Sequence, residues 1–544
     1  MSATLLLAGG SIVDGSGGFR RADVLVADGR VAEVRTEGLE PGAASDDRTP
    51  SVDQVIDCSG RIVMPGFVDA HSHAGSLLFE ERVQLALLRQ GVTTVVTGQD
   101  GVGPAPGDGA YAARYFGAID GPHPTYRGGG IAGLLATYDG TTRVNVATLV
   151  PAGTVRHEVM GDDPGPAGAD QLDAMRMLVL QGMTDGAVGL ASGLDYVPGL
   201  FADAEELAAL AAVAATVGGP YVTHMRGGYE ANTPAGIDEV VRIARAAGAR
   251  AHVSHLHAPV PLALAELARA EQQGVEVGFD AYPYSRGCTI LSMLLLPAGL
   301  ARPGTDDLAR ALEDEDGRRR VRGAVLDRVL GRPDLGTAWA DQVTLSHVPA
   351  PEFHALQGLT LAEAADRTGT DPVDLALDVL VDSDLQVTVI MRVPRPRSAE
   401  ELAALFRSPG HTGGSDGIFV GSHPHPRAYG TFARYLSDYA RAGLLSWREA
   451  QDHLSTSPAA RFGLGRRGVV APGWVADLVV VDPERVRARS TYDEPELLAE
   501  GVDDVLVAGI PVVRRGALTH ATPGAGLRRT EPVEDGVPSG GASD

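Results

Sequence analysis

Strand-like and helix-like segments alternate from about residue 64 to residue 463, and this alternation limits the folds open to the chain. Apolar, β-branched runs lie between stretches rich in Ala, Leu and Glu, for example at 93–96, 145–150 and 251–254. One expected helix begins after Asp203, a suitable N-cap, and ends before Gly218-Gly219. Alternating strands and helices predict an α/β fold with a parallel sheet, and the length favours a closed (β/α)8 TIM-like barrel over residues 65–463.

Both ends of the chain differ from its middle in the secondary structure that their residue patterns predict. Residues 1–64 and 464–520 consist of short strand-like runs, and Asp28-Gly29 between two such runs predicts a hairpin. Their similarity predicts one small β-sandwich domain formed from both chain ends. A charged helical stretch at about 289–350 interrupts the alternation and is interpreted as an inserted helical segment. Residues 521–544, rich in Gly, Pro, Ser and Glu, are expected to be a disordered tail.

The charge balance excludes several classes of partner. The chain has 46 basic and 70 acidic residues, a formal net charge of −24, and no basic cluster beyond Arg318-Arg319-Arg320. Nucleic acid and anionic membrane surfaces need clustered Lys and Arg, so neither is expected as a partner. Two cysteines, Cys58 and Cys288, are too few for a disulfide framework. Without a signal-peptide pattern or a membrane-length apolar run, the expected location is cytoplasmic.

Histidines and aspartates follow the ends of several expected strands. His71 and His73 are spaced i, i+2 after an apolar strand, so their side chains share one face. Groups of the same kind follow later strands, namely Asp100, His224, His255 with His257, and Asp416. Active sites of (β/α)8 barrels lie at the carboxyl ends of the strands, so we expect these groups to meet. Imidazole and carboxylate are ligands for one or two hydrolytic divalent metals.

Several longer blocks match one known family. They are Pro65 to His73, Gly91 to Gly98, Ala191 to Gly199, Gly219 to Arg226, Val253 to Leu256, Asp280 to Tyr284, Gly414 to Gly417, and His425 to Phe432. Together they resemble the amidohydrolase superfamily and, within it, the N-acyl-D-amino-acid deacylases, or D-aminoacylases. The resemblance extends from about residue 5 to residue 515, and the blocks around 196–199 and 425–432 are specific to the deacylase branch.

The resemblance implies a role for each strand-end group. His71 and His73 would hold one metal position, and His224 and His255 a second. Asp416 would bind the first metal and act as general base. The implied cofactor is a divalent metal, most simply Zn²⁺, as one or two ions. The implied reaction deacylates an N-acyl-D-amino acid, with water acidified by metal, and Asp416 passes a proton to the leaving nitrogen.

The chain departs from the family pattern near the expected metals. Asp100 lies in a Gly98-Gln99-Asp100-Gly101 turn where relatives commonly have a metal-binding Cys. A carboxylate can also bridge two ions, and it favours oxygen-liking metals, so this departure is consistent with a two-metal centre. His257 replaces a Lys of the family and is largely neutral at pH 7.

The expected substrate is a small N-acyl amino acid, and its carboxylate needs a cation. Arg226 and Arg286 are the candidates for that contact. The full set of candidate substrate-binding residues is Tyr196, Arg226, His257, Tyr282, Tyr284 and Arg286.

Two alternatives stay open at the level of the sequence. The first is an amidohydrolase that acts on another amide, such as a cyclic amide, a hydantoin-like ring or a dipeptide. Members of that group that bridge two metals with a carboxylated Lys are excluded, because this chain contains no Lys. The second is a catalytically inactive binding protein on the same fold. The presence of Asp416 together with four ligand histidines argues against it.

Overall fold

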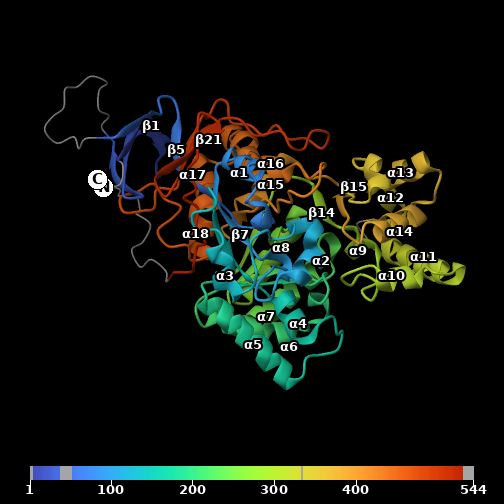
Figure 1. Cartoon of the computed structure of the whole chain (residues 1–544). Coiled ribbons are helices and arrows are strands. Elements are labelled where there is room, and N and C mark those ends of the chain that lie inside the picture. Colours follow the sequence, from blue (N-terminus) through green and yellow to red (C-terminus); the bar gives the residue numbers. More distant parts are fainter. Residues whose placement is uncertain (1–3, 37–51, 333–334, 531–544) are drawn as a thin grey trace.

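The computed structural model describes residues 4–36, 52–332 and 335–530 of the chain. Three parts lie side by side (Figure 1). A β-sheet at one end contains strands from both ends of the chain, an α/β domain occupies the centre, and a lobe inserted late in the chain projects from the opposite side.

Both chain ends contribute strands to one nine-stranded sheet, in the order β21-β20-β19-β18-β5-β1-β2-β3 with β4 beside β1. The strands are β1 Leu5–Val13, β2 Phe19–Ala27, β3 Arg30–Arg35, β4 Gln54–Asp57, β5 Ile62–Pro65, β18 Leu478–Val481, β19 Val502–Val507, β20 Ile510–Arg514 and β21 Ala517–Leu518. Leu478 pairs with Pro65 in an antiparallel ladder that joins the two ends. The hairpin predicted at Asp28-Gly29 is confirmed, and the φ values there, 51° and 74°, are those of a two-residue primed turn.

This sheet curls back on itself instead of forming two separate sheets. The Val31 amide donates to the Trp474 carbonyl at 2.9 Å, and the Gly473 amide donates to the Val31 carbonyl at 2.8 Å. These bonds tie the β3 edge to the segment that enters β18, around a core that includes Leu5 and Leu478. The sandwich predicted from the two ends is therefore one curled sheet in the structure.

The central domain consists of parallel strands that alternate with helices. Its strands are β6 Phe67–Asp69, β7 Val92–Thr97, β8 Asn145–Thr148, β9 Val150–Pro151, β10 Leu190–Gly193, β11 Tyr221–His224, β12 Ala251–Val253, β13 Val277–Ala281 and β17 His411–Gly413. They pair as β6-β7-β8 and as β9-β10-β11-β12-β13-β17. Only Leu149 separates β8 from β9, and the Ala70 amide donates to the Gly413 carbonyl at 3.0 Å between β6 and β17. Backbone continuity and hydrogen bonding thus connect the two groups of strands at both ends.

Helices connect these strands, as their apolar faces require. They are α1 Glu81–Leu88, α2 Ala110–Asp120, α3 Gly130–Ala136, α4 Ala152–Met160, α5 Ala169–Thr184, α6 Ala204–Ala215, α7 Thr233–Ala247, α8 Val260–Gln272, α15 Ala399–Phe406, α16 Arg427–Arg434, α17 Trp447–Gln451 and α18 Ser457–Arg461. The helix expected after Asp203 is α6. The Asp203 carboxylate accepts hydrogen bonds from the amides of Glu205 and Glu206, which confirms its role as the N-cap.

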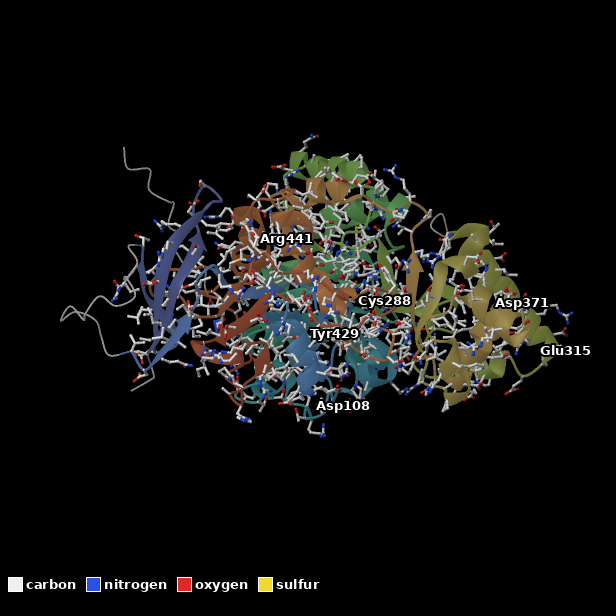
Figure 2. All side chains as sticks on the ribbon, turned by 90° about the horizontal axis from the view of Figure 1, so that it is seen from above. Asp108, Cys288, Glu315, Asp371, Tyr429 and Arg441 are labelled. Atoms are coloured by element: carbon white, nitrogen blue, oxygen red, sulfur yellow. The ribbon has the colours of Figure 1, made fainter. Side chains whose placement is uncertain are left out.

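The inserted lobe is larger than the sequence predicts. It contains β14 Arg286–Ile290, α9 Leu291–Leu295, α10 Asp306–Ala311, α11 Glu315–Leu330, α12 Trp339–Gln342, β15 Val343–His347, α13 Leu361–Thr368, α14 Pro372–Asp382 and β16 Thr388–Arg392. The expected bounds of 289–350 are wrong, because α13, α14 and β16 share the lobe's own apolar core. Their amphipathic patterns do not distinguish them from helices and strands of the central domain. Glu315 and Asp371 mark the far end of this lobe in Figure 2.

The disorder predicted for 521–544 is wrong for its first part. Residues 521–530 run along the central domain, where the Leu527 amide donates to the Val146 carbonyl at 2.7 Å and the Thr530 amide donates to the Gly463 carbonyl at 2.9 Å. Leu527 also packs against a buried apolar cluster of the central domain. A Gly- and Pro-rich composition does not reveal such pairing, because the partners lie far away in the sequence. Residues 531–544 lie outside the described part of the chain.

Candidate metal centre

The strand order brings the six expected metal ligands to one place. His71 and His73 follow β6, Asp100 follows β7, His224 ends β11, His255 follows β12, and Asp416 follows β17. All of these strands are parallel, so their carboxyl ends lie on the same side of the sheet. All six side chains are buried. The fold therefore places these six side chains close together, where they could share metal ions.

One group of potential ligand atoms is formed by His71, His73 and Asp416. The His73 Nε2 atom lies 3.3 Å from Asp416 Oδ1, and His71 Nε2 lies 3.7 Å from the same oxygen. All three ligand atoms lie within 4.8 Å of one another. This spacing allows one cation to contact two imidazoles and a carboxylate at the same time.

Asp100 lies between this group and the other two histidines. Its Oδ1 atom is 3.4 Å from His255 Nε2, 3.8 Å from His71 Nε2 and 3.9 Å from His224 Nδ1. Its Oδ2 atom is 3.6 Å from His73 Nε2. Asp100 thus contacts all four histidines, as a bridging carboxylate would.

Further carboxylates hold the outer nitrogens of the imidazoles. Asp120 Oδ1 lies 2.8 Å from His73 Nδ1, and Asp195 Oδ2 lies 3.2 Å from His224 Nε2. Asp280 Oδ2 lies 3.5 Å from His71 Nδ1. Such partners fix the ring orientation and make the inner nitrogen a better ligand. The sequence motifs predict no role for these three aspartates, and Asp120, at the end of helix α2, carries no signal that could have revealed it.

A buried arginine completes the surroundings of Asp416. The Arg427 side chain has no exposed surface, and its Nη2 atom lies 2.7 Å from Asp416 Oδ2. Burial alone would raise the pKa of Asp416. The Arg427 guanidinium and the nearby imidazoles outweigh this effect and hold the pKa of that carboxyl well below its usual range. Asp416 is therefore ionised at neutral pH, with Oδ2 on Arg427 and Oδ1 facing the histidines.

The donor set suits a divalent cation. The Nε2 atom of His71 and the Oδ1 atom of Asp100 are buried without a protein hydrogen-bond partner, and buried polar atoms normally have one. Burial lowers the pKa of His73, but Asp120 and Asp416 raise it more, to about 10, so the site favours positive charge. A cation bound by imidazole and carboxylate groups would give these unpaired atoms a partner, and the nearby negative charges would stabilise it.

Three of the six potential ligands have left-handed backbone conformations. The φ angle is 54° at Asp100, 35° at His255 and 49° at Asp416. Such conformations cost on the order of 1–3 kcal/mol each and persist only where the surrounding structure imposes them. Here they turn the chain sharply as it leaves the strand, which directs the side chain across the strand ends.

Five of the six potential ligands, all but His71, line a small cavity of about 100 Å³, together with only some of the predicted substrate residues. Tyr196, His257 and Tyr282 line it. His257 Nδ1 lies 3.2 Å from Glu230 Oε1. Tyr284 does not line it, because its ring packs below the guanidinium of Arg434 and its hydroxyl reaches the Pro426 carbonyl at 3.4 Å. The prediction of Tyr284 as a substrate contact is therefore not supported by its position.

Neither predicted arginine lines this cavity. Arg226 donates to the carbonyls of Leu200 and Ala202 and to Glu239. Arg286 stacks on the Tyr492 ring, with its guanidinium carbon 3.8 Å from the ring centroid. Their positions therefore do not support the predicted carboxylate contact, because proximity along a strand does not fix the direction of a long side chain.

The inserted lobe supplies two cationic side chains at the cavity that are not predicted from the sequence. Arg332, which follows α11, and Arg392, at the end of β16, both line the cavity beside Cys288. Figure 2 shows Cys288 where the lobe meets the central domain. Arg392 is the cross-strand partner of Arg286, which places two guanidinium groups on neighbouring strands. The cavity wall therefore combines the strand ends of the central domain with a positively charged edge of the lobe.

Imidazoles and carboxylates gathered at the carboxyl ends of parallel strands are typical of metal-dependent hydrolases of the α/β class. The sequence pattern described as "Amidohydrolase family" matches residues 54–513. This chain belongs to that family.

Its similarity to known proteins extends over nearly the whole chain. N-acyl-D-glutamate deacylase of Alcaligenes xylosoxydans xylosoxydans is 32% identical, over 96% of each chain. D-aminoacylase of the same organism is 33% identical, over 97% of this chain and 98% of that protein. A crystal structure of N-acyl-D-glutamate deacylase from Bordetella bronchiseptica, complexed with zinc and a phosphonate inhibitor, matches with a TM-score of 0.78 at 32% identity, over 97% of this chain and 100% of that one. Structures of D-hydantoinase match only at 16% identity and a TM-score of 0.53, which indicates a shared fold.

Within the described part of the chain, no helix is both long enough and apolar enough to cross a membrane.

Proposed function

We propose that this protein is a metal-dependent deacylase of N-acyl-D-amino acids, which releases a carboxylate and a free D-amino acid. The observation that supports this most strongly is the buried cluster of four histidines, Asp100 and Asp416, five of which line one cavity, in a chain 32–33% identical to two such deacylases. The Arg427–Asp416 pair adds an ionised carboxylate at the position where a general base is needed.

In this proposal the six strand-end groups hold one or two divalent ions, with Zn²⁺ as the first candidate. His71, His73 and Asp416 would hold one ion, His224 and His255 a second, and Asp100 would bridge them. When bound, such ions polarise an amide carbonyl and acidify water.

The chain's own proton carrier would be Asp416. Arg427 holds Oδ2 of this carboxylate, so Oδ1 stays directed at the reacting centre. Because the pKa of Asp416 is lowered, the carboxylate is free to accept a proton at neutral pH. It can then donate that proton to the nitrogen of the leaving amine. The outer aspartates, including Asp120, keep the imidazoles in place during these transfers.

We infer that Arg392 and Arg332 attract the carboxylate of the substrate. Both line the cavity on the side of the lobe. Burial lowers the pKa of neighbouring Arg286, Tyr492 opposes this shift, and the charge of Arg392 adds to it. A carboxylate near Arg392 and Arg332, within a cavity of low dielectric constant, is stabilised more strongly than in water.

We further propose that the parallel strands form a closed (β/α)8 barrel. The bonds between β6 and β17 and the continuity of β8 with β9 support closure. The domain boundaries that follow are 65–463 for the barrel, interrupted by the lobe, and 1–64 with 464–520 for the sheet of both chain ends.

A substrate panel tests the proposed activity. We expect N-acetyl-D-amino acids to be hydrolysed with kcat/KM at least about 100-fold higher than their L-enantiomers, because the cavity walls fix the carboxylate relative to the scissile bond. Release of free amine is measured for both series, and for a hydantoin and a dipeptide, after reconstitution with zinc, manganese or cobalt. Chelated protein should be inactive and regain activity with metal. Hydrolysis of the hydantoin alone would contradict the proposal.

Asp100→Ala tests the bridge. We expect metal content to fall by about one ion per chain, because Asp100 contacts all four histidines and Ala offers no ligand. Metal content is measured by elemental analysis after purification and after dialysis against zinc. Asp100→Cys, which offers a thiolate, is the matched control and should restore binding. Unchanged metal content in Asp100→Ala would make Asp100 a turn residue only.

A further inference from the structure

A second, larger cavity lies directly beside the catalytic one. Its volume is about 640 Å³, compared with about 100 Å³ for the cavity at the potential metal ligands. Ligand sites usually measure about 300–1,000 Å³, so the larger cavity falls in this range and the catalytic cavity falls below it. The catalytic cavity alone is therefore too small for any but a compact N-acyl amino acid.

The two cavities share a wall. Asp195, Tyr229, Glu230, Met293 and Arg332 line both. Asp195 is also the group that holds the outer nitrogen of His224. A substrate whose scissile bond lies at His224 would therefore have the larger cavity one side chain away.

Apolar side chains from two parts of the chain face each other across the larger cavity. Leu194, Val197 and Leu200 come from the segment that follows β10, whereas Met293, Leu296 and Ala298 come from the lobe. Apolar walls of this kind gain free energy by covering hydrocarbon.

Two of the three arginines that line this cavity, Arg226 and Arg328, are already engaged by protein acceptors, and the third, Arg332, lies on the wall shared with the catalytic cavity. Arg226 donates to two backbone carbonyls and to Glu239. Arg328 donates to the carbonyls of Met293 and Leu294. Because these hydrogen bonds already satisfy donors of both guanidinium groups, the apolar wall decides what the cavity prefers to bind.

We propose that this larger cavity binds the acyl chain of N-acyl-D-amino acids whose acyl group is a medium or long hydrocarbon chain. The proposal rests on the proposed deacylase function and specifies its substrate class. The amide carbonyl would lie at the strand-end ligands, the amino-acid carboxylate would face Arg392, and the hydrocarbon would extend past Asp195 and Met293. Each methylene that the cavity buries should raise kcat/KM by up to about fourfold. This gain should appear as a lower KM, because the chain is held equally in the ground state and the transition state.

Filling the cavity tests this proposal. We measure kcat and KM for the N-acetyl, N-hexanoyl, N-decanoyl and N-lauroyl derivatives of one D-amino acid. Wild-type kcat/KM should rise with chain length. Ala298→Phe and Leu200→Trp fill the cavity from opposite walls, and each should lower kcat/KM for the N-lauroyl substrate at least tenfold while N-acetyl turnover stays within twofold. Ala298→Ser is the control for changing position 298 without filling the cavity. Ala309→Phe, on the exposed face of α10, is the control for adding an aromatic ring elsewhere.

A binding measurement separates this proposal from the proposed function. Decanoate, the acid that deacylation would release from the N-decanoyl substrate, is titrated calorimetrically into the wild-type protein and into Ala298→Phe. If decanoate binds the wild type at least tenfold more tightly than the variant, the cavity is supported as the acyl-chain site. This holds even if no N-acyl amino acid is hydrolysed, and in that case only the proposed function fails. Two results would overturn the assignment of the cavity while leaving the deacylase function intact. In the first, N-acetyl substrates are turned over but longer acyl chains bring no gain in kcat/KM. In the second, both filling variants lose the same fraction of kcat/KM for all substrates.

Discussion

Asp416→Asn is expected to lower kcat by about 10²–10⁴-fold, the range that a general base contributes. The amide is similar in size to the carboxylate, but it cannot accept a proton at neutral pH. The substitution also removes an anion from the potential metal ligands, so the loss should lie at the upper end of this range. Single-turnover release of free amine from an N-acetyl-D-amino acid, measured on metal-loaded protein, gives the rate.

Asp120→Asn is the matched comparison for this result. Asp120 holds the outer nitrogen of His73 and does not face the cavity, so its loss should cost only about 10–100-fold. Circular dichroism at the assay temperature establishes that both variants are folded. If Asp416→Asn retained activity similar to the wild type, Asp416 would not be the base.

Arg427→Met is expected to destabilise the protein by about 3–5 kcal/mol, because it leaves the Asp416 carboxylate buried without its cation. Methionine is long and apolar, so packing changes less than charge does. Arg319→Met is the surface control. Arg319 also pairs with an aspartate, but both side chains are mostly exposed, and the expected cost is about 0–1 kcal/mol. Thermal melting of metal-loaded protein, with zinc content determined in parallel, measures the difference.

The sign of the pH dependence follows from the lowered pKa of Asp416. A carboxyl whose pKa is lower in the folded state contributes stability above its unfolded pKa, about 3.9, and this stability is lost as the pH falls through the folded-state pKa. Without Arg427 that contribution shrinks, so the deficit of Arg427→Met should be full at pH 7 and should decrease as the pH falls below about 3.9. Adding Asp416→Asn to Arg427→Met should recover part of the lost stability. A further loss in the double variant would show that the unpaired carboxylate is not the cause.

The six potential metal ligands could be identified from the sequence because each follows the end of a strand. Side-chain direction alternates along a strand, and carboxyl ends of parallel strands lie on one side, so local pattern and topology together place His71 and Asp416 at the same edge. The turn residue Asp100 also follows a strand, and it occupies the position of a cysteine in the family. Its contacts with all four histidines support its inclusion among the potential ligands.

The charged groups around the site could not be identified in the same way. Arg427 begins helix α16 and is directed at Asp416 only in the folded chain. The two predicted arginines bind elsewhere, and Arg332 and Arg392 reach the cavity from a lobe that the sequence bounded too narrowly. Long side chains have several rotatable bonds, so their direction depends on contacts between segments distant in the sequence.

By itself, the sequence determined the alternation of strands and helices, the joint contribution of both chain ends to one region, and the positions of potential ligand residues at the strand ends. These features follow from local periodicity, which can be recognised in short stretches of neighbouring residues. Tertiary structure alone decided that the sheet of both ends curls, that residues 521–530 pair with the central domain, and that the lobe forms part of the cavity wall. It also decided that Arg427 meets Asp416, because burial and charge pairing depend on contacts between residues that lie far apart along the chain.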